Sequence, residues 1–190
     1  FLPAIYICHL KQKDHIHFII KAFLSLWLLL ALIVPYIIPV FSLPSPQGED
    51  SVGTETFHWV DSSRKEWFTE EKSNDYREIM VQVWYPGSNH PNKKVEPYMD
   101  FIKLRSKTIA AAGNLPSFFP SHLNLVKTNS YLEIPCKNKK SGLPIVVFSH
   151  GITGSRHLHQ TLFEHLTSQG YVVVALDHSY DCNLTIFPDG

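Results

Sequence analysis

The longest run of apolar positions lies near the N-terminus. Residues 22–43 read AFLSLWLLLALIVPYIIPVFSL and carry no charged side chain. As a helix this run is about 33 Å long, against about 30 Å of hydrocarbon in a bilayer. A soluble helix of this length would show a polar stripe, and none is present. The pattern predicts a transmembrane helix over 22–43, preceded by a flank (1–21) whose apolar start is compatible with the end of an earlier membrane helix.

The charges beside this run predict its orientation. Lys11, Lys13 and Lys21 precede it, whereas Glu49 and Asp50 follow it. Basic residues favour the cytoplasmic side, so the rest of the chain is expected on the extracytoplasmic side of a membrane. A cleaved signal peptide is the alternative, although its apolar core usually has 7–15 residues and is followed by an A-x-A site, which is absent here.

Alternating apolar and polar positions predict two strands after a Pro/Ser/Gly-containing linker at 44–53. The first is TETFHWVD at 54–61, and the second is REIMVQVWY at 77–85, which ends at a Pro-Gly pair. Together they predict an antiparallel opening pair. Residues 96–134 have a mixed pattern, in which a helix over 98–112 and a break at Gly113 are the main features.

The most regular pattern comes last. Two continuous apolar runs, PIVVFS at 144–149 and YVVVALD at 171–177, are typical of parallel strands covered on both faces. Between them, apolar residues recur at helical spacing over 155–168, and Gly170 suits the end of a helix. The pattern predicts a right-handed strand, helix, strand crossover in an α/β fold.

Composition narrows the class of protein. The 17 basic and 17 acidic residues form no long block of one sign, which does not favour a nucleic-acid partner. Cys8, Cys136 and Cys182 have neither disulfide-framework nor zinc-knuckle spacing. The 54–190 segment is short for an α/β domain, and the chain starts at Phe1 and stops after an apolar stretch. We therefore expect 54–190 to be the N-terminal part of a longer domain.

The residues that suggest chemistry are Ser149-His150-Gly151-Ile152-Thr153-Gly154, a glycine-containing turn between a buried strand and a helix. Such a turn exposes backbone N–H groups, and an esterase needs donors where the acyl oxygen becomes anionic. In α/β-hydrolases one donor comes from this loop. The backbone N–H of Ile152 is the natural candidate, with Gly151 and His150 supporting the loop. Alternatively, the glycines only permit a tight turn and His150 only fills a polar pocket.

Other chemistries fit this segment less well. Neither GxxxxGK[ST] nor GxGxxG is present, so nucleotide binding is not favoured. His150, His157, His159 and His165 lack metal-ligand spacing, which favours a solvated histidine face, and we expect no metal and no cofactor. No GxSxG nucleophile motif occurs in the chain. In this fold the serine, the aspartate and the histidine follow in that order, so all three are expected beyond Gly190.

Longer blocks carry a resemblance to a known family. FSHGITGSRHLHQTLFEHLTSQGYVVVALDHSYDCNLTIFPDG, VGTETFHWVDSSRKEWF, NDYREIMVQVWYPG and LPSFFPSHLNLVKTNSYLEIP, which together span 51–190, resemble platelet-activating factor acetylhydrolases of the plasma and intracellular type-II form, including microbial membrane-attached relatives. The resemblance implies an α/β-hydrolase fold and a calcium-independent serine esterase.

What the resemblance implies about chemistry is specific. Such an enzyme removes acetyl or other short or oxidised acyl chains from the sn-2 position of phospholipids by a Ser-His-Asp mechanism. The resemblance gives Ile152 the oxyanion-hole amide, and it puts Asp177, His178, Tyr180 and Asp181 at the mouth of the pocket. Because the triad is absent, these 190 residues alone are expected to be inactive. The alternatives are a dienelactone-hydrolase-like or polyester-hydrolase-like esterase, and a non-catalytic membrane-tethered module.

Overall fold

The computed structural model describes residues 2–37, 40–69, 75–88, 94–137 and 142–189. Side chains are described from residue 15 onward, except at 35 and 37. The chain divides into two compact units, Phe1–Val40 and Phe41–Gly190, and each is treated by itself.

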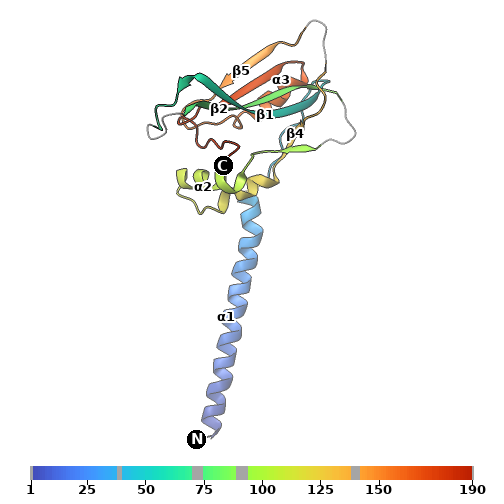
Figure 1. The fold of residues 1–190 in the computed structure, drawn as a ribbon. Coiled ribbons are helices and arrows are strands. Elements are labelled where there is room, and N and C mark those ends of the chain that lie inside the picture. The colour runs from blue at the N-terminus through green and yellow to red at the C-terminus, as the bar shows by residue number, and fades with distance from the viewer. Residues whose placement is uncertain (1, 38–39, 70–74, 89–93, 138–141, 190) are drawn as a thin grey trace. The chain divides into compact units, whose positions relative to one another are not determined.

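The first unit is one long helix, α1 (Leu2–Ile37), visible as the blue rod in Figure 1. Its segment His15–Val34 is apolar and long enough to cross a membrane, and a signal sequence has the same properties. The helix begins and ends earlier than the run predicted over 22–43. Pro35 and Pro39 lack the amide hydrogen that a helix needs, which disfavours continuation beyond this region. Pro39 lies outside the described residues.

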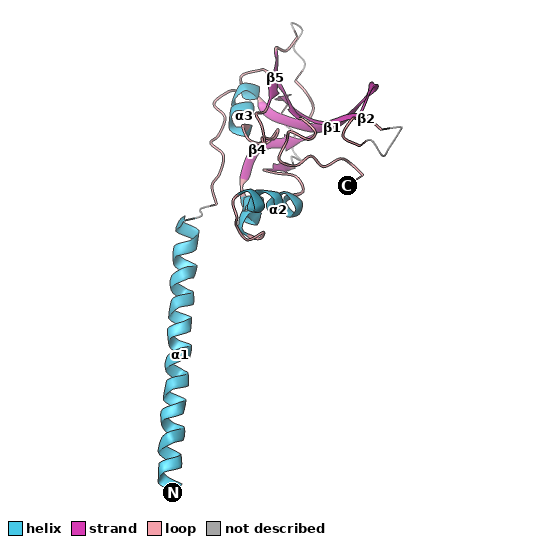
Figure 2. Ribbon diagram, turned by 90° about the vertical axis from the view of Figure 1, so that its left-hand side faces the viewer, coloured by secondary structure: helices cyan, strands magenta, loops and turns pink. Residues whose placement is uncertain are grey.

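The second unit contains a six-stranded mixed sheet in the order β3-β4-β1-β2-β6-β5. Figures 1 and 2 show the strands side by side, with helix α3 (Gln160–Ser168) against one face. A second helix, α2 (Ile102–Ala112), contacts the 3-10 helix η1 (Phe119–Leu125) instead.

The predicted antiparallel opening pair is confirmed. Strand β1 (Ser51–Lys65) pairs with β2 (Tyr76–Gly87), in a register that sets Ser51 opposite Gly87. Both strands are longer than predicted, because the pairing continues past the apolar core on both sides. Strand β2 then pairs antiparallel with β6 (Val172–Asp177), which sets Met80 opposite Asp177. The start of β2 therefore lies at the same end of the sheet as the end of β6.

The predicted parallel pair is also confirmed, since β5 (Ile145–Ser149) runs parallel to β6. The expectation that both strands are covered on both faces is wrong for β5. This strand is the outermost of the sheet, and Ile145 and Val147 are 65% and 66% exposed. Ile145 and Val147 lie on the face opposite Val146 and Phe148, which pack against the core, and their own face is uncovered in the described part of the chain. The outer edge of β5 also has no partner strand within the described residues.

Two strands were missed in the mixed region. Strands β3 (Val95–Pro97) and β4 (Lys127–Leu132) pair with each other, and β4 adds parallel to the start of β1. Strand β3 has only three residues, and β4 reads KTNSYL, so neither carries an apolar signal. The predicted helix over 98–112 begins later, at Ile102.

The core lies between α3 and the middle of the sheet. Val52, Trp84, Phe163, Val173 and Ala175 are each at most 2% exposed. The rings of Trp84 and Phe163 have centroids 5.0 Å apart, in a tilted arrangement typical of packed aromatic pairs. Phe163 is the residue that anchors α3 on the sheet.

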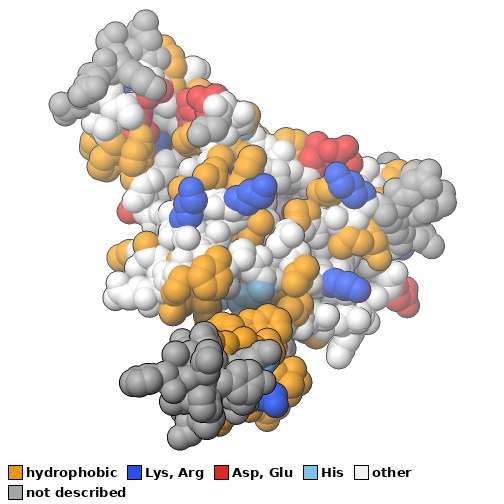
Figure 3. Space-filling view, turned by 90° about the horizontal axis from the view of Figure 1, so that it is seen from below, with side chains coloured by type: hydrophobic (Ala, Val, Ile, Leu, Met, Phe, Trp, Pro, Cys, Tyr) orange, Lys and Arg blue, Asp and Glu red, His pale blue; other side chains and the backbone are white. Residues whose placement is uncertain are grey.

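A buried carboxylate also ties α3 to strand β4. Glu164 is fully buried and accepts hydrogen bonds from Asn129 N (2.9 Å), Asn129 Nδ2 (2.8 Å) and Ser130 Oγ (2.8 Å). A buried carboxylate is costly unless its oxygens accept hydrogen bonds. The three hydrogen bonds to Glu164 therefore help to fix the position of α3 against β4. Figure 3 shows acidic and basic side chains scattered among hydrophobic and uncharged groups, with some groups of opposite sign next to each other.

Glu96, on β3, is a buried acid without a cationic partner at hydrogen-bond distance. It accepts a hydrogen bond from Gln82 Nε2, and its Oε2 is buried without a partner among the described residues. Burial raises the pKa of Glu96 from 4.5 to about 8, against the opposing effect of the Gln82 hydrogen bond. The side chain is therefore protonated in the folded protein at neutral pH.

Glu96 is expected to make stability fall as the pH rises. The unfolded chain loses this proton near pH 4.5 and the folded protein only near pH 8, so the folded state binds more protons between these values. The free energy of unfolding should then decrease by up to about 1.4 kcal/mol per pH unit in this window. This decrease in the free energy of unfolding is measured by urea unfolding of the full-length protein at several pH values, followed by tryptophan fluorescence. In Glu96→Gln the decrease should disappear, and an unchanged slope in this variant would contradict the assignment.

Candidate active site

The site predicted from the sequence lies at the C-terminal ends of the parallel strands β5 and β6, which are at the same end of the sheet. After Ser149 the chain forms turns over 151–159, and α3 begins only at Gln160. The predicted helix over 155–168 is therefore shorter than expected. Its first turn is replaced by a loop whose backbone is held by other parts of the unit.

His150 orients the peptide that carries the candidate donor. The N–H of His178 donates to His150 Nε2 (3.0 Å), so in the neutral ring the proton is on Nδ1. Nδ1 lies 2.8 Å from the carbonyl oxygen of Gly151, to which it can donate. That carbonyl belongs to the peptide whose N–H is on Ile152. In a trans peptide C=O and N–H point in opposite directions, so this bond also orients the Ile152 N–H.

The loop is further held by the segment after β6. Thr153 N donates to Asp181 O (2.8 Å), Asn183 N donates to Gly154 O (3.0 Å), and Gly154 N donates to Gly151 O (2.9 Å). Thr153 has a φ of 60°, a conformation that is unfavourable for a β-branched residue. Such strain persists only where surrounding contacts impose it, and it is concentrated at functional sites.

Of the two glycines, Gly154 is required by packing. A Cβ there would lie 2.9 Å from the Gly151 oxygen and 2.9 Å from His150 Cβ. A Cβ on Gly151 would meet no atom within 4 Å, so packing does not explain this glycine. The Ile152 side chain is 89% exposed, and its N–H donates to no acceptor in the described part of the chain. The arrangement is a hydrogen-bonded turn in which the Ile152 N–H is available as a donor.

Beneath this loop lies a buried ion pair that the sequence did not predict. Asp177, at the end of β6, accepts hydrogen bonds from Arg156 N (2.7 Å) and from the Arg156 guanidinium. Both side chains are fully buried. Asp177 thus caps the loop, and its bonds with Arg156 give it a structural role.

The ion pair continues towards α2. Asp100 bonds the Arg156 guanidinium and also accepts from Arg105 Nε (2.7 Å), while His157 Nε2 lies 3.5 Å from Asp100 Oδ1. Burial alone would raise the pKa of Asp100, but Arg156, His157 and Arg105 together lower it. Burial, reinforced by Arg156, holds the pKa of His157 well below its usual value, so His157 is neutral. The cluster balances two cations with two anions.

The expectation of a solvated histidine face is wrong for two of the four histidines. His150 and His157 are 8% and 3% exposed, because one orients the oxyanion loop and the other packs into the ion-pair cluster. His159 is exposed. Near neighbours in sequence thus belong to different environments.

Three potential metal ligands do converge here. Ligand atoms of His150, Asp177 and Cys182 lie within 4.8 Å of one another. However, His150 Nε2 already accepts the His178 N–H, and Asp177 is neutralised by Arg156. A cation would have to displace both partners, and burial raises the pKa of the Cys182 thiol. These residues are better explained as structural.

A serine and a histidine also meet at this edge, since Ser149 Oγ lies 2.6 Å from His178 Nε2. Within the described residues no carboxylate bonds His178, so the pair lacks the acid that orients the histidine of a triad. Sequence analysis placed His178 at the mouth of the pocket but did not identify its contacts with Ser149 and His150.

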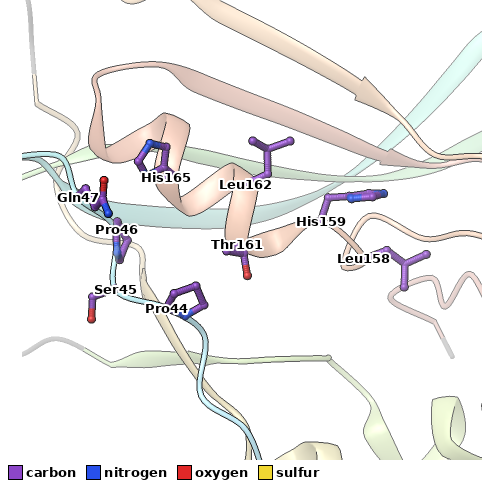
Figure 4. A pocket seen from close by; sticks show the side chains of 9 residues that line it. All are labelled: Pro44, Ser45, Pro46, Gln47, Leu158, His159, Thr161, Leu162 and His165. Carbon is purple, nitrogen blue, oxygen red and sulfur yellow. The ribbon is translucent and has the colours of Figure 1, made fainter.

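A larger pocket lies elsewhere, between residues 44–47 and α3 (Figure 4). It has a volume of about 510 Å³, and its walls come from 44–47 and from Leu158, His159, Thr161, Leu162 and His165. None of its lining residues belongs to the 150–154 loop, so this cavity is not part of the candidate active site.

The mixed sheet, with its parallel β5–β6 unit and the loop that follows β5, has the α/β-hydrolase fold. A solved structure titled as a ferulic acid esterase from Streptomyces cinnamoneus is similar, with a TM-score of 0.62 and 31% identity over 80% of this chain. The chain belongs to the family described as platelet-activating factor acetylhydrolase, isoform II, whose family model matches residues 42–186.

A curated relative agrees with this membership. A Schizosaccharomyces pombe protein named "Putative phospholipase A2" is 34% identical over 111 residues, in a match that covers 54% of this chain. The match spans 24% of that relative, and the similarity to the esterase covers 40% of the solved chain. The chain therefore spans less than half the length of each of these two proteins.

Proposed function

We propose that the full-length protein is a serine esterase that hydrolyses the sn-2 acetyl or short or oxidised acyl ester of phospholipids, with the Ile152 N–H as one oxyanion-hole donor. Membership of the family supports the lipid-ester substrate. The observation that carries the proposal is the Gly151–Ile152 peptide, which His150 holds with its N–H available. A donor of this kind is typically responsible for about 2.7–4 kcal/mol of transition-state stabilisation.

The remaining catalytic groups are proposed to come from a later part of the protein. The outer edge of β5 has no partner strand in the described ranges, and its alternate side chains are exposed and apolar. A parallel strand added there would cover this edge and end beside the 150–154 loop. A nucleophilic serine in the turn after that strand would face the Ile152 N–H, with its histidine and aspartate further along the chain.

We also propose a domain organisation in which 1–21 is a flank, 22–43 a membrane anchor, 44–53 a linker and 54–190 the first part of the hydrolase domain. The apolar segment His15–Val34 supports an anchor by its length and composition. The basic residues before it support an extracytoplasmic hydrolase domain. In sealed membrane vesicles of known orientation, protease should then digest the hydrolase domain only where the extracytoplasmic side faces outward.

The catalytic assignment is tested with a fluorophosphonate probe on the full-length protein. We expect the probe to label one serine beyond Gly190, to abolish hydrolysis of a phospholipid with an sn-2 acetyl group, and to leave a polypeptide of residues 1–190 unlabelled. Peptide mapping by mass spectrometry identifies the labelled residue. Labelling within residues 1–190, or turnover of an ester by that polypeptide, would contradict the proposal.

A second candidate is an esterase for other carboxylic esters, which the similarity to a ferulic acid esterase supports. A panel of short-acyl phospholipid, lactone, aryl ester and feruloyl ester substrates separates the two. The first candidate predicts the highest kcat/KM for phospholipids, and the absence of such a preference would favour the second.

A further inference from the structure

The hairpin of β1 and β2 continues past strand β6 at the end of the sheet that carries the candidate active site. Strand β6 pairs with β2 from Met80 onward, so residues 76–79 of β2 extend beyond it. Two large side chains just after β1, Trp67 and Phe68, are 79% and 67% exposed. Exposed aromatic side chains that lie together commonly mark a binding surface.

The end of this hairpin contacts the segment after β6, which Figure 1 shows beside it in dark red. The ring of Phe68 stacks on the ring of Tyr180 with 4.4 Å between the centroids, and the Arg77 guanidinium lies 5.5 Å from the Tyr180 centroid. Tyr180 has a φ of 74°, which is unfavourable for a residue with a Cβ and persists only where surrounding contacts impose it. The next residue, Asp181, bonds Thr153 N through its carbonyl oxygen (2.8 Å). The aromatic contact is therefore one residue away from the group that holds the 150–154 loop.

A pocket of about 270 Å³, the arginine pocket, is lined by Arg64, Trp67, Phe68 and Arg77. Arg64 uses its Nε for Asp61 Oδ2 (2.6 Å), and Arg77 uses its Nη1 for Glu66 Oε2 (3.1 Å). Because a guanidinium has five N–H groups, both arginines keep donors for a ligand. Two guanidinium groups beside aromatic rings suit a phosphate diester, whose oxygens accept charge-assisted hydrogen bonds.

A second pocket, of about 210 Å³, adjoins the first, because Phe68 lines the arginine pocket and Tyr180, stacked on Phe68, lines the second. We call it the tyrosine pocket, after its aromatic residues Tyr76, Tyr180 and Phe187. Its described lining has no lysine or arginine but four carboxylates, those of Glu66, Asp75, Glu78 and Asp189. Aromatic faces and carboxylates both attract an ammonium group.

The two pockets favour opposite charges on either side of one stacked pair of rings. A phosphate alone would fit the arginine pocket but would face the carboxylates of its neighbour. A phosphate joined to an ammonium by a two-carbon chain complements both pockets at once. A quaternary ammonium suits the aromatic walls best, because it is recognised by the faces of aromatic rings rather than by hydrogen bonds.

We propose that these two pockets bind the zwitterionic headgroup of a glycerophospholipid, with the phosphate diester in the arginine pocket and the quaternary ammonium in the tyrosine pocket. This inference rests on the proposed esterase function and assigns the headgroup preference of that enzyme. The segment 178–181 joins the headgroup site to the 150–154 loop. It thus positions the lipid relative to the proposed oxyanion donor.

A headgroup series on the full-length enzyme tests the preference. The substrates are three 1-alkyl-2-acetyl lipids with a phosphocholine, a phosphoglycerol or no phosphate, each at the same mole fraction in detergent micelles. The kcat/KM for phosphocholine should exceed each of the other two by about tenfold, as one charge-assisted contact allows. Equal kcat/KM values for the three lipids would overturn the proposal.

Two substitutions assign the preference to the two pockets. Tyr180→Leu should reduce the ratio of kcat/KM for phosphocholine to that for phosphoglycerol to near one, because it removes a ring of the tyrosine pocket. Its matched control is Tyr171→Leu, at an exposed tyrosine directly before β6 that lines neither pocket. Arg64→Gln, at a side chain that is 70% exposed, should lower kcat/KM for both phosphate lipids and leave the phosphate-free lipid unchanged. Wild-type ratios in both Tyr180→Leu and Arg64→Gln would refute the site.

A binding measurement without hydrolysis separates this inference from the proposed function. Glycerophosphocholine, which has no acyl ester, should change the tryptophan fluorescence of the full-length protein, and Trp67→Phe should lose this change. Inorganic phosphate and choline chloride should each bind at least about tenfold more weakly, because each fills one pocket only. If glycerophosphocholine binds in this way but no phospholipid is hydrolysed, the esterase assignment fails and the headgroup site stands. If phospholipids are hydrolysed and glycerophosphocholine does not bind, the headgroup site fails alone.

Discussion

Arg156→Met is expected to destabilise the hydrolase domain by about 3–5 kcal/mol, because it leaves the fully buried carboxylate of Asp177 without its cation. The substitution also removes the guanidinium contact with Asp100, on which the approach of α2 to the loop depends. Urea unfolding of the full-length protein in detergent, followed by tryptophan fluorescence, measures the change. The free energy of unfolding should fall without a change in the slope against urea.

The matched control is Arg64→Met, which breaks an ion pair of similar length at the surface. Arg64 Nε lies 2.6 Å from Asp61 Oδ2, but the Arg64 side chain is 70% exposed and the pair is screened by water. No measurable change in stability is expected. Equal effects of the two substitutions would show that the buried cluster is not the structural support of the loop.

Ile152→Pro is expected to lower kcat of the full-length esterase by about a hundred- to a thousand-fold. Proline has no amide hydrogen, so the variant loses the donor proposed to bind the oxyanion in the transition state. The Ile152 N–H bonds no other described group, so little stability should be lost. Steady-state kinetics with an sn-2 acetyl phospholipid provides the measurement, with KM expected to change far less than kcat.

An independent variant separates the loss of a donor from a distorted loop. His150→Leu keeps the Ile152 N–H but removes the imidazole that holds the Gly151 carbonyl. It should reduce kcat less than Ile152→Pro, because the peptide is free to rotate but still carries its hydrogen. If kcat of Ile152→Pro stays within about threefold of wild type in a folded protein, the donor lies elsewhere.

The strands that could be predicted from the sequence are those in which the order of apolar and polar side chains reflects the place of the strand in the sheet. Strand β2 is apolar because its middle is buried, and β6 is continuously apolar because it lies inside the sheet. Strand β1 alternates in sequence although Trp59 and Val60 are about half exposed. Strand β4 was missed because Ser130 and Thr128 satisfy buried hydrogen bonds there, so its sequence reads as polar. Local periodicity cannot reveal a strand whose burial depends on partners distant in the sequence.

The same distinction holds for the active site. His150, Gly151 and Ile152 were identifiable because strand, glycine turn and helix follow one another directly in the chain. The ion pairs of Arg156 were not identifiable from the sequence, because Asp177 lies 21 positions away from Arg156 and Asp100 lies 56 positions away. Nothing in the spacing of these residues indicates that they meet, and their burial depends on the packing of α2 and of the chain after β6.

Order along the chain was thus sufficient to specify an apolar N-terminal helix, an antiparallel pair, a parallel unit and a turn with an exposed amide. The direction of that amide arises from contacts across the fold, chiefly the His178 N–H on His150 and the Asp181 carbonyl on Thr153. A backbone turn has several accessible orientations, and hydrogen bonds from distant segments select one of them.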